Sequence, residues 1–248
     1  KMIWEELAKL RVDGGSYWIK KVKETLFYFI DKMSGKCGIS GHDIIWYPLD
    51  FAAQLRGPQI YTDMYDHSDE LHRLLNFAVN AFIEIMEEIR DIVGTYEDGY
   101  FSCWQCWEPK TSIGPESSDT AAQCSNEFYQ EFCFPYTQKI VNHFGNTWVH
   151  VHNSGLHQLP EIMKLKGLLG VEITDDPGQP RAFDRKEDLK RVINYKPMII
   201  NCLLKELQRG MEEETLSGGT LYRIIEKVSI DEANKLMEKV WKYRINES

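Results

Sequence analysis

Two histidines lie two residues apart in the segment His150-Val151-His152-Asn153-Ser154-Gly155. If this segment is a β-strand, residues two apart point to the same face, so both imidazoles can reach one ligand. Imidazole is a common metal ligand and a general acid or base near neutral pH. The pair therefore predicts a metal site or a proton-transfer site. Two histidines with structural hydrogen bonds explain the same pattern equally well.

Carboxylates at two other places could act with these histidines. Asp175 and Asp176 follow an apolar run and precede Pro177, while Glu108 and Asp119 lie in a long polar segment. Adjacent carboxylates change each other's pKa or orient a neighbouring group. Aspartates before a proline are also common turn formers, which is at least as good an explanation of the first pair.

The cysteines suggest thiols rather than a disulfide framework. The chain has six cysteines in 248 residues, and Cys103 and Cys106 form one CxxC pair with no second pair nearby. On a strand these two thiols would face opposite sides, which favours buried structural cysteines over a metal or redox pair. We therefore expect free cysteines and a reducing, cytoplasmic compartment.

Charge and hydropathy exclude two classes of partner. The formal net charge of −9 and the lack of a basic stripe oppose binding to nucleic acid, which needs positive charge along the phosphate backbone. No apolar run is long enough to span a bilayer, and residues 1–6 lack the layout of a secretory signal. We expect a protein that acts on a small molecule and does not bind a membrane.

Short apolar or β-branched runs alternate with amphipathic stretches, a pattern typical of βα units rather than hairpins. The predicted strands are 44–47, 100–104, 147–152, 170–174, 198–202 and 220–224. The predicted helices are 67–93, 122–144, 156–167, 184–194, 203–214 and 229–243. Ser68 is the predicted N-cap of the first helix, and 184–187 and 229–232 have the form of capping boxes.

Repeated βα units form either a closed barrel or a doubly wound sheet, and the pattern alone does not separate the two. Six units are fewer than the eight of a complete barrel, so either early units are missing or residues 1–41 fold irregularly. In both architectures catalytic groups follow the carboxyl ends of strands. The residues at the predicted ends are Cys106, Trp107, Glu108, Asp119, His150, His152, Asn153, Ser154, Asp175, Asp176, Cys202 and Tyr222.

Five segments in order give the chain a likeness to a known family. They are 46–49 with 55–57, 71–75, Ser118-Asp119 with 124–132 and 135–136, His152-Asn153-Ser154-Gly155, and 230–234. Over about residues 42–243 the chain resembles the uroporphyrinogen decarboxylase superfamily, which includes cobalamin-dependent methyltransferases. The resemblance implies an α/β fold of the (β/α)8 TIM-barrel type that is incomplete at the N-terminus. Residues 1–41 would be an irregular or helical segment and residues 42–248 the barrel domain.

The methyltransferase branch of the family implies zinc, held by a His-x-Cys pair and a later cysteine, which activates a thiol acceptor. His152 matches the histidine of that pair, whereas Ser154 stands where its cysteine would be. His150, Cys202 and Glu108 are the candidates to complete a changed metal site with His152.

We expect one-carbon (methyl) transfer with a corrinoid carried by a separate protein. In this hypothesis His152 and Ser154 contact substrate or metal, and Asp119 and Asp175 orient it. The pocket walls would be Trp104, Trp107 and Tyr222.

Two alternatives stay open. The first is cofactor-free decarboxylation of a tetrapyrrole, in which Asp119 or Asp175 holds the pyrrole N–H groups. The acidic residues at the predicted strand ends, Glu108, Asp119, Asp175 and Asp176, oppose this reaction, because they would repel a substrate with many carboxylates. The second is a non-catalytic barrel subunit completed by another chain. Since missing units expose strand edges, we also expect a homodimer through such an edge.

Overall fold

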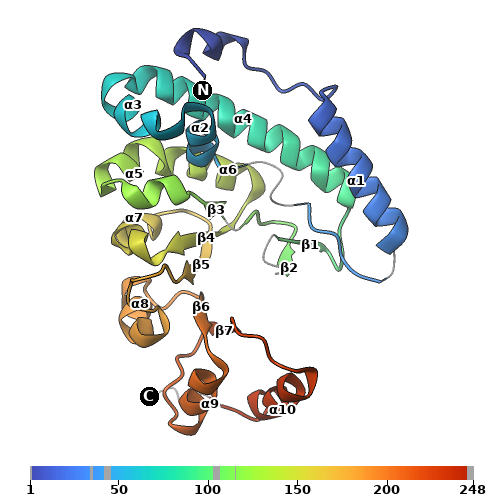
Figure 1. Ribbon diagram of the computed structural model, residues 1–248, viewed down its shortest axis with the longest axis vertical. Helices are drawn as coiled ribbons and strands as arrows, with labels where there is room; N and C mark the ends of the chain where they lie inside the picture. Colours follow the sequence, from blue (N-terminus) through green and yellow to red (C-terminus); the bar gives the residue numbers. More distant parts are fainter. Residues whose placement is uncertain (1, 34–35, 42–45, 103–106, 115, 245–248) are drawn as a thin grey trace.

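The computed structural model describes residues 2–33, 36–41, 46–102, 107–114 and 116–244, and its centre is a five-stranded parallel β-sheet (Figure 1). The strand order is β3-β4-β5-β6-β7, which is also the order in the chain. The strands are β3 (Glu116–Ser117), β4 (Thr147–His152), β5 (Leu168–Thr174), β6 (Met198–Cys202) and β7 (Thr220–Ile224). The predicted α/β class with a parallel sheet is confirmed. Among the described residues β3 and β7 are the two edges, so the sheet is open.

Helices cover one face of the sheet. Figure 1 shows α5, α7 and α8 along this side, with the hairpin β1–β2 on the other. Side chains of alternate strand residues are fully buried under the helices, as in Val171 and Ile173 of β5 and Met198 and Ile200 of β6. This outer face is the apolar core. The opposite, inner face carries polar and aromatic side chains together with the aliphatic Ile199 and Leu221.

The helical elements follow the predicted pattern with local changes. The α-helices are α1 (Tyr17–Met33), α2 (Pro48–Arg56), α3 (Ile60–Asp66), α4 (Ser68–Val93), α5 (Asn126–Phe132), α6 (Phe134–Phe144), α7 (Leu159–Ile162), α8 (Lys186–Val192), α9 (Leu204–Glu212) and α10 (Ile230–Val240). The 3-10 helices are η1 (Trp4–Lys9), η2 (Gly57–Gln59), η3 (Asp119–Gln123), η4 (Asn153–Gln158) and η5 (Phe183–Arg185). None of the described helices is long and apolar enough to cross a membrane.

Three of the predicted strands match the structure residue for residue, namely β4, β6 and β7, and the helix predicted over 67–93 is α4. In the last capping box, Ser229 Oγ accepts a hydrogen bond from the Glu232 backbone N–H, as predicted. Asp184 does not cap a helix, because a 3-10 turn precedes α8. The N-cap of α4 is His67 rather than Ser68.

Other predicted elements differ from the structure in extent or in pairing. The helix expected over 122–144 is divided at Cys133, since Pro135 has no N–H to extend α5 and instead lies in the first turn of α6. The strand expected over 100–104 is β1 (Gly99–Phe101), and it pairs antiparallel with β2 (Trp107–Pro109) in a separate hairpin. Part of the strand expected over 44–47 lies outside the described residues, and Tyr47 is the residue before α2.

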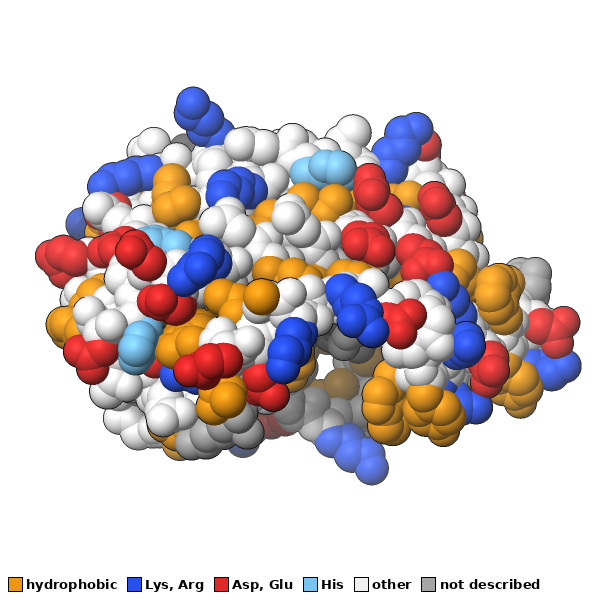
Figure 2. Space-filling view, turned by 90° about the horizontal axis from the view of Figure 1, so that it is seen from above, with side chains coloured by type: hydrophobic (Ala, Val, Ile, Leu, Met, Phe, Trp, Pro, Cys, Tyr) orange, Lys and Arg blue, Asp and Glu red, His pale blue; other side chains and the backbone are white. Residues whose placement is uncertain are grey.

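The N-terminal half covers one end of the sheet. The long helix α4 contacts α1, α2 and α6, and its buried stripe joins the same core as the strands. Within residues 1–41 the described structure contains η1 and α1. Figure 2 shows the face seen from the top of Figure 1, where acidic and basic side chains are interspersed.

The assignment of the two faces predicts unequal effects of truncation. Ile200→Ala removes a fully buried side chain from the helix-covered face, so it should lower the free energy of unfolding by about 2–5 kcal/mol. Leu221→Ala on the inner face, 53% exposed, should change it by less than about 0.5 kcal/mol. Urea denaturation of both variants measures the difference. Equal losses would mean that the faces are wrongly assigned.

Candidate metal centre

The inner face of β4 brings His150 and His152 together with Asp119, the first residue of η3. Asp119 Oδ1 lies 3.4 Å from Nε2 of His152 and 3.9 Å from Nε2 of His150. One possible ligand atom from each of the three residues lies within 4.8 Å of the others. The prediction that residues at successive strand ends gather around one point therefore agrees with the geometry for these three.

Each histidine has a second carboxylate on its other ring nitrogen. His152 Nδ1 lies 2.6 Å from Asp176 Oδ1, and His150 Nδ1 contacts the carboxylate of Glu172. A carboxylate only accepts hydrogen bonds, so we assign the ring proton to Nδ1 in both histidines. In the neutral rings Nε2 is then an acceptor directed at Asp119. Three acceptor atoms facing one another attract a shared cation.

The supporting carboxylates are themselves held in place. Asp176 accepts a hydrogen bond from the Ser154 backbone N–H at 3.1 Å, and its own N–H donates to Asn153 Oδ1 at 3.0 Å. Glu172 is almost fully buried, and it accepts hydrogen bonds from the Arg223 guanidinium of β7 and the Thr174 hydroxyl. These contacts fix the orientation of both imidazole rings before any ligand binds.

Asp119 is the accessible member of the site. Its side chain is 51% exposed, compared with 7% for His150. The Asp119 and Thr120 N–H groups donate to the buried carboxylate of Asp50, which anchors the start of η3. The centre therefore has two rigid imidazoles and one carboxylate at the solvent boundary.

The charged groups of the site raise the pKa of His152 and lower the pKa of Glu172. Burial alone would lower the pKa of His152, but the hydrogen bond to Asp176 and the charge of Asp119 raise it. Burial alone would raise the pKa of Glu172, but the hydrogen bond and charge of His150 and the charge of Arg223 lower it. The carboxylates around His152 thus favour positive charge at this imidazole, whether from a proton or from a metal ion.

The donor set fits zinc or a similar first-row metal. Two imidazole nitrogens and one carboxylate oxygen are a common protein ligand set for catalytic zinc, in which a fourth position is left for water or substrate. Carboxylates behind the histidines are the usual outer partners in such sites. Asp119, His150 and His152 could hold the ion, with Glu172 and Asp176 as their supports.

Two other predicted site residues, Ser154 and Asp175, stabilise the loops around the centre. Ser154 contributes its backbone N–H to Asp176. Asp175 accepts a hydrogen bond from the Ala182 N–H at 2.8 Å and pairs with Arg181 at 3.4 Å, which shapes the loop after β5. Neither side chain belongs to the cluster of ligand atoms.

Three further candidates lie away from the centre. Cys202 is fully buried on the helix-covered face, and Tyr222 lies on that same face with its hydroxyl accepting from the Ser217 N–H at 2.7 Å. Glu108 of β2 is buried beside Arg90, 3.9 Å away. The expectation that Cys202 or Glu108 completes the metal site, and that Tyr222 walls the pocket, is corrected by these positions. Trp107 does line a cavity on the inner face, and Trp104 lies outside the described residues.

Sequence reasoning missed Glu172 and Arg223, which hold His150 in place. The signal was present, because Glu172 is a charged residue within the apolar run Leu168–Thr174. A buried charge of this kind needs a partner, and the partner is commonly functional.

Comparisons with known proteins assign no family to this geometry. No family model matches the chain, and no curated protein sequence matches it significantly.

Loss of one metal-binding side chain should weaken the binding of zinc. We expect purified protein to bind one zinc ion per chain, and His152→Ala or Asp119→Ala to weaken zinc binding by more than about 100-fold, beyond the effect typical of outer partners. Competition with a chromophoric chelator measures the affinity. His143→Ala is the matched control, because His143 lies on the surface beside Glu87. Equal zinc affinities of the unaltered protein and the three variants would contradict the proposed metal centre.

A buried carboxyl beside the site should make stability depend on pH. Burial raises the pKa of Glu116 to about 7, although hydrogen bonds from the Ser118 and Thr137 hydroxyls oppose the shift. Because the folded pKa exceeds the unfolded value of 4.5, the protonated form stabilises the fold. This stability is present below pH 4.5 and is lost as pH rises through about 7.

Glu116→Gln should therefore reduce the loss of stability between pH 5 and pH 8 by up to about 3 kcal/mol. Burial also raises the pKa of Glu108 to about 7, so the double variant with Glu108→Gln should be less pH-dependent still. Urea unfolding at several pH values gives the two profiles. An unchanged slope in Glu116→Gln would show that Glu116 does not titrate in this range.

Proposed function

We propose that the protein is a zinc-dependent enzyme of one-carbon transfer that moves a methyl group from a corrinoid, carried by a separate protein, to a small-molecule thiol. The observation that carries this proposal is the position of Asp119 Oδ1 close to both histidine Nε2 atoms, with a carboxylate behind each ring. When bound, zinc lowers the pKa of a thiol and favours the reactive thiolate.

The resemblance to the uroporphyrinogen decarboxylase superfamily supports the choice of reaction. In this resemblance His152 matches the family's zinc-binding histidine, and His150 and Asp119 would take the place of the sulfur ligands of that site. The proposal also includes the type of α/β fold. Strands that follow one another in both chain and sheet are the arrangement of a barrel segment, so we infer an incomplete (β/α)8 barrel.

The chain's own residues would hold and expose the reacting group. Glu172 and Asp176 orient the imidazoles, and Arg223 balances the charge of Glu172. Asp119 and Asp176 then balance the charge of a dication. The exposed side of Asp119 leaves an approach for the thiol and for the methyl donor on its carrier protein.

Decarboxylation of a tetrapyrrole is less well supported. The inner-face guanidinium of Arg223 is already paired with Glu172, and Asp119 and Asp176 would repel the carboxylates of such a substrate. A metal-free protein that bound a porphyrinogen would reverse this preference.

Methyl transfer can be measured with methylcobalamin as donor and 2-mercaptoethanol as acceptor. The thiol loses its proton to solvent, its sulfur forms the new bond to the methyl carbon, the carbon–cobalt bond breaks, and the electron pair of that bond stays with cobalt. We expect a zinc-dependent change in the visible spectrum of methylcobalamin and formation of the methyl thioether. His152→Ala should reduce the rate at least about tenfold, in line with the loss of a metal partner.

Tyr222→Phe is the matched control, since Tyr222 lies on the helix-covered face, and it should retain the rate. Absence of thioether from protein that binds zinc would exclude this reaction. The site would then belong to another metal-dependent activity.

A further inference from the structure

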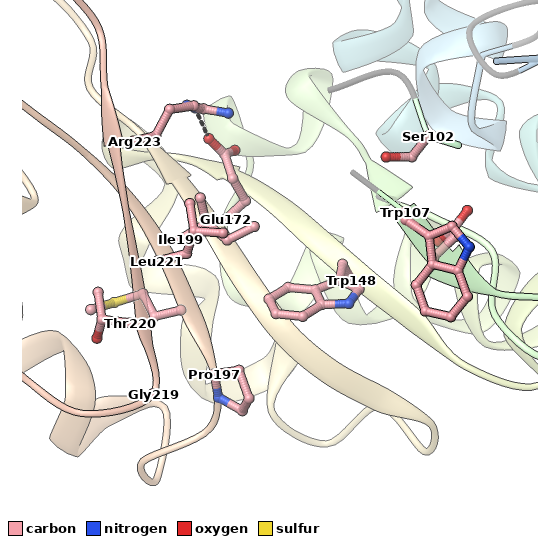
Figure 3. A pocket seen from close by; sticks show the side chains of 12 residues that line it. Ser102, Trp107, Trp148, Glu172, Pro197, Ile199, Gly219, Thr220, Leu221 and Arg223 are labelled. Carbon is pink, nitrogen blue, oxygen red and sulfur yellow. Dashed lines mark hydrogen bonds and ion pairs between the residues drawn. The ribbon is translucent and has the colours of Figure 1, made fainter. Parts of the chain in front are cut away.

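A cavity of about 560 Å³ lies on the inner face of the sheet, between the strands and the β1–β2 hairpin (Figure 3). Trp148 of β4, Ile199 of β6 and Leu221 of β7 line it from the sheet, and Trp107 of β2 lines it from the hairpin. In Figure 3 the ion pair of Glu172 and Arg223 forms one end of the cavity, and Pro197 and Gly219 lie at the other. The cavity thus runs along the strands from their first residues to their middle.

The lining is chiefly apolar, and its charged groups already have partners in the protein. Glu172 binds His150 and Arg223, and Arg223 also donates to Asn201 Oδ1 at 2.8 Å. Glu108 lies 3.9 Å from Arg90. A ligand would therefore gain little from polar contacts here, and recognition would depend on shape and on contact with the two indole rings.

The cavity lies directly beside the candidate metal centre. Trp148 and His150 are two residues apart on β4 and face the same side, so they are separated by about 7 Å along the strand. Glu172 belongs to both places: Oε2 contacts His150, while Oε1 contacts Arg223 at the end of the cavity. A molecule whose reacting end is at the metal centre can extend its body into this space.

We propose that the thiol acceptor carries an apolar, ring-bearing body that binds in this cavity against Trp148 and Leu221, with its sulfur at the Asp119–His150–His152 centre. This inference rests on the proposed methyl transfer and names the substrate class. Cavities of several hundred Å³ accommodate whole small molecules, so a two-carbon thiol would leave most of this space unfilled. The carboxylates of Glu108 and Glu172 disfavour an anionic body.

The test compares two thiols by isothermal titration of the zinc-loaded protein. 2-Phenylethanethiol should bind at least about tenfold more tightly than 2-mercaptoethanol, because its ring buries apolar surface. Leu221→Asp should remove this preference, and Tyr222→Phe, the adjacent residue on the opposite face, should keep it. Equal affinities for the two thiols in the zinc-loaded protein would overturn the inference and leave the proposed methyl transfer intact.

A second titration separates the cavity from the metal. 2-Phenylethanol, which lacks the thiol, should bind metal-free protein, and Leu221→Asp should abolish this binding. A different result separates the two proposals. If zinc does not bind, but 2-phenylethanol binds and Leu221→Asp abolishes this binding, the apolar cavity is supported while the proposed function fails. If 2-phenylethanol does not bind the metal-free protein, the cavity is not a ligand site and the inference is wrong.

Discussion

The pairing of His150 with Glu172 is the interaction on which the candidate site depends. The parallel register of β4 and β5 places these two residues opposite each other, on the inner face of adjacent strands. Val149 and Val171 are likewise opposite each other, and they are buried under the helices. A slip of one residue would exchange the two faces, so the apolar core and the polar site require the same register.

This arrangement extends beyond two strands. A carboxylate as deeply buried as that of Glu172 is costly unless its charge is compensated, and Arg223 of β7 supplies the compensation across β6. His150 therefore depends on the correct order of four strands. Glu172 borders both the metal centre and the apolar cavity, so one side chain contributes to both parts of the inner face.

The sequence predicted those features that depend on local pattern. Short apolar or β-branched runs predicted β4, β6 and β7, and an amphipathic stretch predicted α4. The histidine pair and Asp119 were found because reactive residues gather at the carboxyl ends of parallel strands. The hairpin β1–β2 and the two-residue strand β3 were missed because their pairing is set by tertiary contacts in segments too short to show a period.

Cys202 and Tyr222 were assigned to the site because they stand at the end of one strand and within another, and proximity to an end does not specify a face. Cys202 has the same parity as the buried residues Met198 and Ile200, which explains why it lies in the core. Glu172 was overlooked for a related reason, since its partners His150 and Arg223 are 22 and 51 residues away in the chain. Pairings over such distances follow from the sheet and not from local sequence.

Zinc X-ray absorption spectroscopy of the protein tests the central claim most directly, because it identifies the atoms around the metal. Two imidazoles and oxygen at about 2.0–2.2 Å, with no sulfur in the absence of an added thiol, are expected if Asp119, His150 and His152 hold the ion. A shell containing sulfur at about 2.3 Å would place the metal on a cysteine and contradict the proposed centre.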